Sequence, residues 1–190
     1  MAGRPRTIDR DKVLDAAEAI VTQQGAAALT IDAVAKASKI TKGGVQYCFV
    51  SKDNLLRAMI DRWQNAFDDE VERYVAADPQ PNALIRGHLL ATRDGADGDQ
   101  SRSAVMLTTL LQQPQEVAAS REWYLTRLAG LNYDIPTDRR AAIAFIAGEG
   151  AFLLRALGFV EFEASDWEKL FNDILALVDE DGGAATESDN

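Results

Sequence analysis

Residues 30–55 read TIDAVAKASKITKGGVQYCFVSKDNL, and this stretch predicts two short helices joined by a tight turn and followed by a longer helix. Thr30 suits the cap of the first helix, because its hydroxyl can accept a hydrogen bond from an unpaired backbone N–H. Thr41 and Ser51 stand before the next two predicted helices in the same way. Two short helices about four residues apart have the layout of a helix-turn-helix, which lays its second helix in the major groove of DNA.

The second of these helices carries residue types that bind nucleic acid. Gly43 and Gly44 cost a helix about 1 kcal/mol each relative to Ala, and we expect them where the backbone must come close to a large partner. Hydroxyl, amide, phenol and ammonium groups surround them and can contact phosphates and base edges. The residues predicted to contact DNA in this stretch are Thr30, Thr41, Lys42, Gly43, Gly44, Gln46, Tyr47 and Lys52, with Gln46 and Gly44 nearest the bases.

Charge is distributed unevenly along the chain. The net charge is −10, which by itself argues against DNA binding. Residues 1–52, however, hold eight Lys or Arg against five Asp or Glu, whereas the remaining residues hold twelve against twenty-five. Affinity for nucleic acid depends on such local basic regions rather than on the net charge. Arg4 and Arg6 extend the basic region into an arm that either reaches into the minor groove or stays a solvated tail.

The N-terminal third of the chain resembles the DNA-binding domain of the TetR (tetracycline repressor) family. The matching features are the basic lead at 3–6, the helix VLDAAEAIV at 13–21, Gly25 followed by Thr30, Val34-Ala35, Ile40-Thr41-Lys42-Gly43, and Phe49, Ser51, Lys52 and Leu55 at the family's spacing. Two positions depart from the pattern. Lys39 stands in the turn where the family usually has Gly, and Gln46 stands where an aromatic phosphate contact is common. The resemblance implies a DNA-binding transcriptional regulator that works as a dimer.

Helical periodicity continues through the rest of the chain, and no segment is typical of a strand. Helices are predicted over 8–24, 51–78, 82–93, 101–112, 114–131, 137–159 and 165–180, in addition to the two short ones. The fold class is therefore all-α, with about nine helices. We expect a helix-turn-helix domain at 1–52, a ligand-binding and dimerisation domain at 53–180, and a disordered acidic tail at 181–190.

The second domain contains apolar and aromatic residues that either line a ligand cavity or form an ordinary core. The predicted ligand-binding residues are Trp63, Phe67, Met106, Leu110, Trp123, Tyr124, Phe145, Glu149 and Phe152. Glu149 is a carboxylate among apolar neighbours, and such a group is normally paired. Its partner is either a cationic or hydrogen-bonding ligand, or one of Arg86, Arg127 and Arg155.

Small residues near the C-terminus let helices approach closely. Proteins of the TetR family pair their last two helices with those of a second subunit, so the resemblance implies a homodimer here, and the alternative is an internal core. The predicted interface residues are Ala144, Ala147, Gly148, Ala151, Phe171, Ile174, Leu175 and Val178.

Several classes of function are not supported by the composition. One histidine, His88, and one cysteine, Cys48, complete no catalytic triad and no metal site, so we expect no enzyme, no metal and no cofactor. Cys48 is interpreted as a small residue on the second helix, with redox sensing as the alternative. A lone cysteine, no signal peptide and no long apolar run predict a cytoplasmic protein without a membrane partner.

These observations predict a homodimeric transcriptional repressor that binds a palindromic operator in double-stranded DNA. A small apolar or amphipathic effector would release it. Two alternatives stay open. One is a helical carrier or enzyme for a small molecule with an incidental helix-turn-helix, and the other is an architectural DNA-binding protein without an effector.

Overall fold

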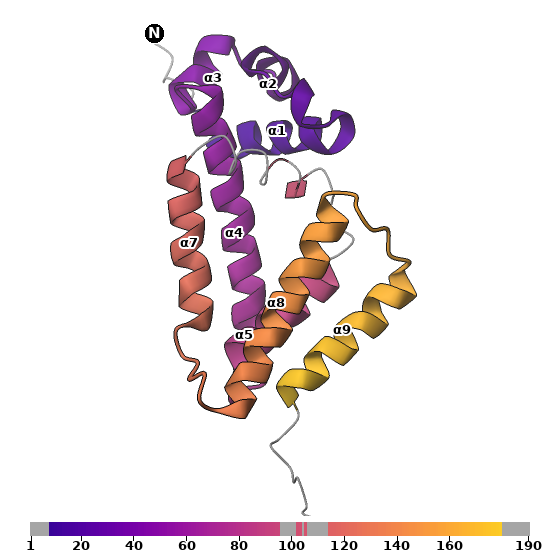
Figure 1. The fold of residues 1–190 in the computed structure, drawn as a ribbon. Helices are drawn as coiled ribbons and strands as arrows, with labels where there is room; N and C mark the ends of the chain where they lie inside the picture. Colours follow the sequence, from indigo (N-terminus) through magenta and orange to yellow (C-terminus); the bar gives the residue numbers. More distant parts are fainter. Residues whose placement is uncertain (1–7, 96–101, 104, 106–113, 180–190) are drawn as a thin grey trace, which may run out of the picture. The chain divides into compact units, whose positions relative to one another are not determined.

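The computed structural model describes residues 8–95, 102, 103, 105 and 114–179 (Figure 1). Their helices are α1 (Arg10–Gln24), α2 (Ile31–Ser38), α3 (Lys42–Cys48), α4 (Lys52–Ala77), α5 (Ala83–Asp94), α7 (Pro114–Leu128), α8 (Pro136–Ala156) and α9 (Ala164–Asp179), with a short 3-10 helix η1 (Ala26–Ala28) after α1.

The all-α prediction is confirmed, because the described residues contain these helices and no strand. They form eight α-helices, one fewer than the nine predicted. The helix predicted over 101–112 falls largely outside the described residues. Within the described ranges, no helix combines the length and the apolar run that crossing a lipid bilayer requires.

The chain divides into two compact units. The first consists of residues 1–66 and 101–112, and the second of residues 67–100 and 113–190. Because α4 runs without a break from Lys52 to Ala77, it supplies residues to both units. The domain boundary predicted after residue 52 stays a prediction.

The core of the first unit is built on the apolar stripe of α1. Val13, Leu14, Ala17, Ile20 and Val21 recur at helical spacing, and all five are buried. The other helices of the unit pack against this stripe with the buried residues Val34 from α2, Val45 from α3, Phe49 after it, and Leu55 and Met59 from α4. The helix-turn-helix therefore rests on a shared apolar core.

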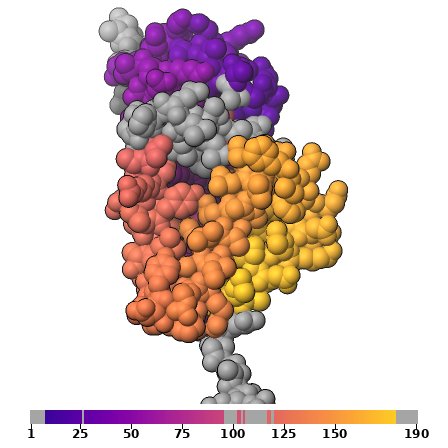
Figure 2. Space-filling view, viewed as in Figure 1, coloured from indigo at the N-terminus to yellow at the C-terminus, as the bar shows by residue number. Residues whose placement is uncertain are grey.

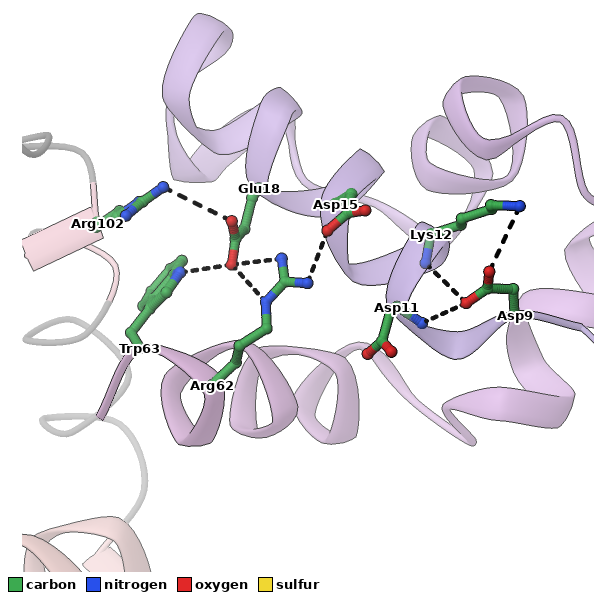
Figure 3. Close-up of polar contacts among 8 residues, drawn as sticks. All are labelled: Asp9, Asp11, Lys12, Asp15, Glu18, Arg62, Trp63 and Arg102. Carbon is green, nitrogen blue, oxygen red and sulfur yellow. Dashed lines mark hydrogen bonds and ion pairs between the residues drawn. The ribbon is translucent and has the colours of Figure 1, made fainter. Parts of the chain in front are cut away.

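A network of charged side chains joins α1 to α4 (Figure 3). Glu18 Oε1 accepts hydrogen bonds from Arg62 Nε at 2.9 Å and from Trp63 Nε1 at 2.7 Å. Arg62 also donates to Asp15 at 2.7 Å, and Arg102 lies 3.6 Å from the second Glu18 oxygen. Glu18 thus gathers two cations and an indole N–H around one half-buried carboxylate.

The core of the second unit lies among α5, α8 and α9. Helices α8 and α9 pack against each other, and their orange and yellow surfaces adjoin in Figure 2. Gly148 permits a close approach between α8 and α5, because a Cβ added there would lie 2.4 Å from Leu89 Cδ2. Leu89 and Phe171 are fully buried beside it.

Most of the residues predicted for the dimer interface lie inside this core. Ala144, Gly148, Ala151, Phe171, Ile174 and Leu175 are buried against their own chain. Ala147 and Val178 are partly buried and pack on the same cluster. These residues therefore pack within their own chain, as the alternative of an internal core requires, and their predicted contact with a second copy stays a prediction.

Candidate functional site

The turn between α2 and α3 is made by a residue with positive φ. Lys39 has φ 57° and ψ 35°, a left-handed conformation that costs a non-glycine residue on the order of 1 kcal/mol. The N–H of Ile40, next in the chain, donates to the Ala35 carbonyl at 3.0 Å, which closes the end of α2. Ile40 then packs against the core of the unit, so the turn holds α3 on α2.

Two threonine hydroxyls cap the helices of this motif. Thr30 Oγ1 accepts a hydrogen bond from the N–H of Ala33 at 3.1 Å, and Thr41 Oγ1 accepts one from the N–H of Gly44 at 3.1 Å. Each hydroxyl acts as an acceptor in its cap, so its own hydrogen remains able to be donated to a phosphate. Both threonines are exposed.

The two glycines of α3 have different surroundings. Gly43 is exposed, and a Cβ there would meet nothing within 4 Å. A Cβ on Gly44 would lie 2.6 Å from Ile40 Cγ2 and 3.0 Å from Ile8 Cδ1, so internal packing already explains that glycine. Close approach of another molecule is therefore needed to explain the absence of a side chain only at Gly43. The predicted DNA contact of Gly44 stays a prediction.

The outer face of α3 presents polar side chains to solvent. Tyr47 is 85% exposed, and Gln46 and Lys52 are also exposed. The Lys42 ammonium donates to Asp32 Oδ2 at 3.0 Å, and both side chains are well exposed. A phosphate that binds Lys42 must therefore share it with Asp32 or displace that carboxylate. Arg4 and Arg6 lie outside the described residues.

A second polar cluster lies in the other unit, where α5, α7 and α8 each supply one side chain. Glu149 Oε1 lies 2.6 Å from His88 Nε2, and the Tyr124 hydroxyl donates to Glu149 Oε2 at 2.6 Å. Burial, reinforced by the Glu149 carboxylate, raises the pKa of Tyr124 above its ordinary range. Tyr124 therefore keeps its proton and remains the donor.

His88 is 1% exposed, and its Nδ1 has no hydrogen-bond partner among the described residues. An unmet buried polar atom costs about 1–3 kcal/mol. Aromatic rings surround the imidazole, with ring centroids at 4.8 Å for Phe145, 5.0 Å for Phe67 and 5.6 Å for Trp123. The orphan nitrogen is thus held among hydrophobic rings that offer it no hydrogen bond.

A carboxylate and a guanidinium flank Trp123. The indole Nε1–H donates to both Asp68 oxygens, at 3.1 and 3.2 Å, and Arg127 forms an ion pair with the same carboxylate. The Arg127 guanidinium also lies over the Trp123 ring, 4.4 Å from its centroid. Asp68 therefore balances the charge of Arg127 locally.

Comparison with protein families gives two matches that together span both units. The model described as bacterial regulatory proteins, tetR family, matches residues 13–59, and the tetracyclin repressor-like C-terminal domain matches residues 82–179. The chain belongs to the TetR family. It is a transcriptional regulator with a helix-turn-helix DNA-binding domain, as the N-terminal residues predicted.

Solved structures of the TetR family share this fold. SCO4454, a TetR-family transcriptional regulator from Streptomyces coelicolor, is 19% identical with a TM-score of 0.68, over 90% of this chain and 94% of that one. The multidrug binding protein EbrR complexed with ethidium is 24% identical with a TM-score of 0.61, over 87% and 96%. FadR from Thermus thermophilus, in complex with lauroyl-CoA, is 20% identical with a TM-score of 0.57, over 95% and 97%. A comparison with curated proteins found no match.

The structure of this TetR-family chain brings together five of the residues predicted to bind a ligand, namely Phe67, Trp123, Tyr124, Phe145 and Glu149. Trp63 belongs to the other unit, where it packs on the α1 core and donates to Glu18. Phe152 is half-buried and makes none of the described ring contacts with the cluster. Met106 and Leu110 lie outside the described residues.

The partners of Glu149 differ from the arginines considered from the sequence. Arg86 pairs with Asp78 and Asp179, Arg127 pairs with Asp68, and Arg155 lies over the Trp167 ring. His88 takes that place instead, a role that sequence reasoning missed. The signal was its position on α5, because Ile85, His88, Leu89 and Thr92 follow helical spacing and all are buried. A histidine on a buried face needs a polar partner.

Proposed function

We propose that this regulator is a homodimeric repressor that binds a palindromic operator and leaves it when a small-molecule effector binds to its second unit. The observation that carries the proposal is the exposed polar face of α3 within a helix-turn-helix, where Tyr47 is 85% exposed. An aromatic phenol left in solvent at that position suits a phosphate or sugar contact.

The DNA contacts follow from the exposed groups. Thr30, Thr41, Lys42, Tyr47 and Lys52 contact phosphates, and Gln46 reaches a base edge, where an amide can bond adenine in two places. Ser51 Oγ accepts from the N–H of Asn54 at 3.1 Å and so caps α4. Lys52 is therefore the first residue of α4, where the helix end also attracts an anion.

A palindrome requires two recognition helices about 34–36 Å apart, so the protein must pair with itself. The outer face of α8 supports such a pairing. Ile143, Ile146 and Leu154 follow helical spacing there, and Leu157 caps the helix on the same side; they are 57%, 65%, 43% and 49% exposed. We place the second copy on this apolar face, because the small residues predicted for the interface are covered by their own chain.

The effector is placed in the second unit because of its aromatic and polar cluster around Glu149. Proteins with this fold bind small molecules, as the complexes of EbrR with ethidium and of FadR with lauroyl-CoA indicate. The effector acts by preferring one of two spacings of the paired recognition helices. Because α4 supplies residues to both units, a shift of this helix would carry the change to the helix-turn-helix.

The test is selection of bound duplexes from a random pool by the full chain, with and without a cell extract. A palindromic consensus that is lost in the presence of the extract supports the whole proposal. Selection of a consensus that no extract affects would support an architectural protein, and failure to select any duplex at low salt would refute DNA binding. Turnover or uptake of a small molecule without any duplex preference would support the carrier or enzyme.

A further inference from the structure

The charges around the second-unit cluster do not cancel when His88 is neutral. Glu149 and Asp68 are carboxylates, and Arg127 is paired with Asp68. The hydrogen-bond and ion-pair partners of Glu149 among the described residues are His88 and Tyr124, neither of which is a fixed cation. The carboxylate of Glu149 therefore lacks a permanent countercharge within the described part of the chain.

The hydrogen bonds of the cluster define which group is missing. Glu149 accepts the Tyr124 hydroxyl at one oxygen, and its other oxygen faces His88 Nε2 at 2.6 Å. A neutral imidazole that donates Nε2–H to this carboxylate presents Nδ1 as an acceptor. Because His88 is 1% exposed and Nδ1 is unpartnered, this lone pair calls for an N–H or O–H donor.

The rings around the imidazole select for shape and charge. Phe67, Trp123 and Tyr124 are half-buried rather than buried, so part of each residue remains exposed to solvent. Aromatic faces attract cations and stack on planar rings. A carboxylate without a permanent countercharge beside such faces is the arrangement that recognises an organic cation.

We propose that the cluster of Glu149, His88 and Tyr124 binds an aromatic organic cation, which sits on the rings of Phe67 and Trp123, has its charge balanced by Glu149 and donates an N–H to His88 Nδ1. This inference rests on the proposed effector role of the second unit and specifies the chemical class of the effector. Glu149 sets the preference for positive charge, and His88 sets the preference for a donor.

An anionic effector fits the same residues poorly. Arg127 Nε has no hydrogen-bond partner among the described residues and is a possible anchor for an anion. Its guanidinium, however, is already paired with Asp68 and stacked over Trp123. An anion there would meet the Asp68 carboxylate, so the balance of charge favours a cation.

The test is a calorimetric titration of the full chain, free of DNA, with ethidium, a permanently charged planar cation that carries amino groups. Fluorescein and laurate serve as anionic probes. We expect saturable binding of ethidium and at least tenfold weaker binding of both anions. Equal or tighter binding of either anion would overturn the inference without need of any variant.

Two substitutions separate the roles of charge and hydrogen bonding. Glu149→Gln should weaken ethidium at least tenfold, whereas Glu122→Gln, which removes an exposed carboxylate from α7, should leave its affinity unchanged. His88→Gln retains an amide N–H for Glu149 but carries its acceptor on Oε1, away from the position of Nδ1. It should abolish the preference for ethidium over a phenanthridinium of the same charge that lacks the amino groups.

The inference is overturned if Glu149→Gln binds ethidium as tightly as the unmodified chain does. It is also overturned if Glu149→Gln and its control Glu122→Gln lower the affinity for ethidium equally. Circular dichroism of each variant checks that it is folded. Duplex selection with the same preparations keeps the two proposals apart. If only neutral or anionic molecules release the operator, the proposal of a cationic effector is refuted and the proposal of a repressor stands. If no duplex is selected, the proposal of a repressor is refuted, and the titration still decides the chemical class of the ligand.

Discussion

His88 on α5 and Glu149 on α8 are 61 residues apart in the sequence, and their side chains meet at 2.6 Å. The contact joins two helices of the second unit through a buried imidazole and a largely buried carboxylate, whose side chains are 1% and 15% exposed. Both polar groups depend on each other, because few other polar partners lie among the surrounding rings.

Removal of the imidazole should destabilise the second unit. His88→Ala leaves one oxygen of Glu149 without its partner and opens space among three rings, so we expect a loss of about 2–3 kcal/mol in the free energy of unfolding. His88→Gln, which keeps a donor, should lose less than half of that. Urea unfolding at one fixed protein concentration measures both values, and equal losses would show that packing rather than the hydrogen bond is responsible.

Tyr124 should resist ionisation. Its pKa is raised from the ordinary value of 10.0 by burial and by Glu149. Because the folded-state pKa lies above the unfolded one, the resulting stability is fully present below pH 10 and is lost as the pH rises through the folded-state pKa. Titration followed by phenolate absorbance should show a late component that Tyr124→Phe removes. A late component that persists in this variant would assign it to another tyrosine.

The Asp32–Lys42 ion pair should weaken DNA binding in the unmodified protein. Asp32→Asn frees the ammonium, so affinity for the operator should rise, while stability changes by less than about 1 kcal/mol because the pair is exposed. Lys42→Ala should lower affinity for every duplex and reduce the salt slope by about one unit. Lys169→Ala on α9 is the control and should change neither quantity.

The two glycines of α3 make a matched pair of substitutions. Gly44→Ala places a methyl group 2.6 Å from Ile40 Cγ2 and should cost about 1–3 kcal/mol of stability. Gly43→Ala has open space and should stabilise the helix by up to about 1 kcal/mol. Thermal unfolding distinguishes them. Operator titration of Gly43→Ala then tests a close approach of DNA, since unchanged affinity would exclude contact at that backbone.

The outer face of α8 should hold the dimer together. Ile146→Glu places a charge on an apolar surface that is 65% exposed in the single chain, so it should dissociate a dimer formed there without unfolding the protein. Leu125→Glu on α7, where Leu125 is 52% exposed, is the control. Sedimentation equilibrium gives the mass of each variant. A dimer that survives Ile146→Glu would move the interface away from this face.

Local sequence was sufficient for the helices and the helix-turn-helix. Thr30, Thr41 and Ser51 cap the helices they precede, and the five apolar residues of α1 are buried as their spacing indicates. Such features act within one or two turns of chain, so they can be identified without knowledge of the rest of the fold. Family membership followed from the same local features.

The packing role of Gly44 could not be predicted from local sequence. Its neighbour Ile8 is far from it in the sequence, and only the packing of α3 on the core reveals that a Cβ has no room. The small residues of α8 presented a similar ambiguity, because close helix approach is needed equally inside a core and between subunits. Burial of Gly148 against Leu89 shows that it packs within its own chain, and the predicted contact of these residues with a second copy stays a prediction.

The amino-acid sequence by itself determined that the chain is helical, which family it belongs to and which end of it is basic. The predicted helix ends at 131 and 159 were each three residues too late, because α7 ends at Leu128 and α8 at Ala156. Only the tertiary structure decided that Glu149 meets His88 and Tyr124 rather than an arginine, and that Lys42 is held by Asp32. The physical reason is the distance along the chain over which each interaction acts. Caps and periodicity depend on neighbours along the chain, whereas the partner of a buried charge depends on which helix faces are brought together when apolar surfaces pack.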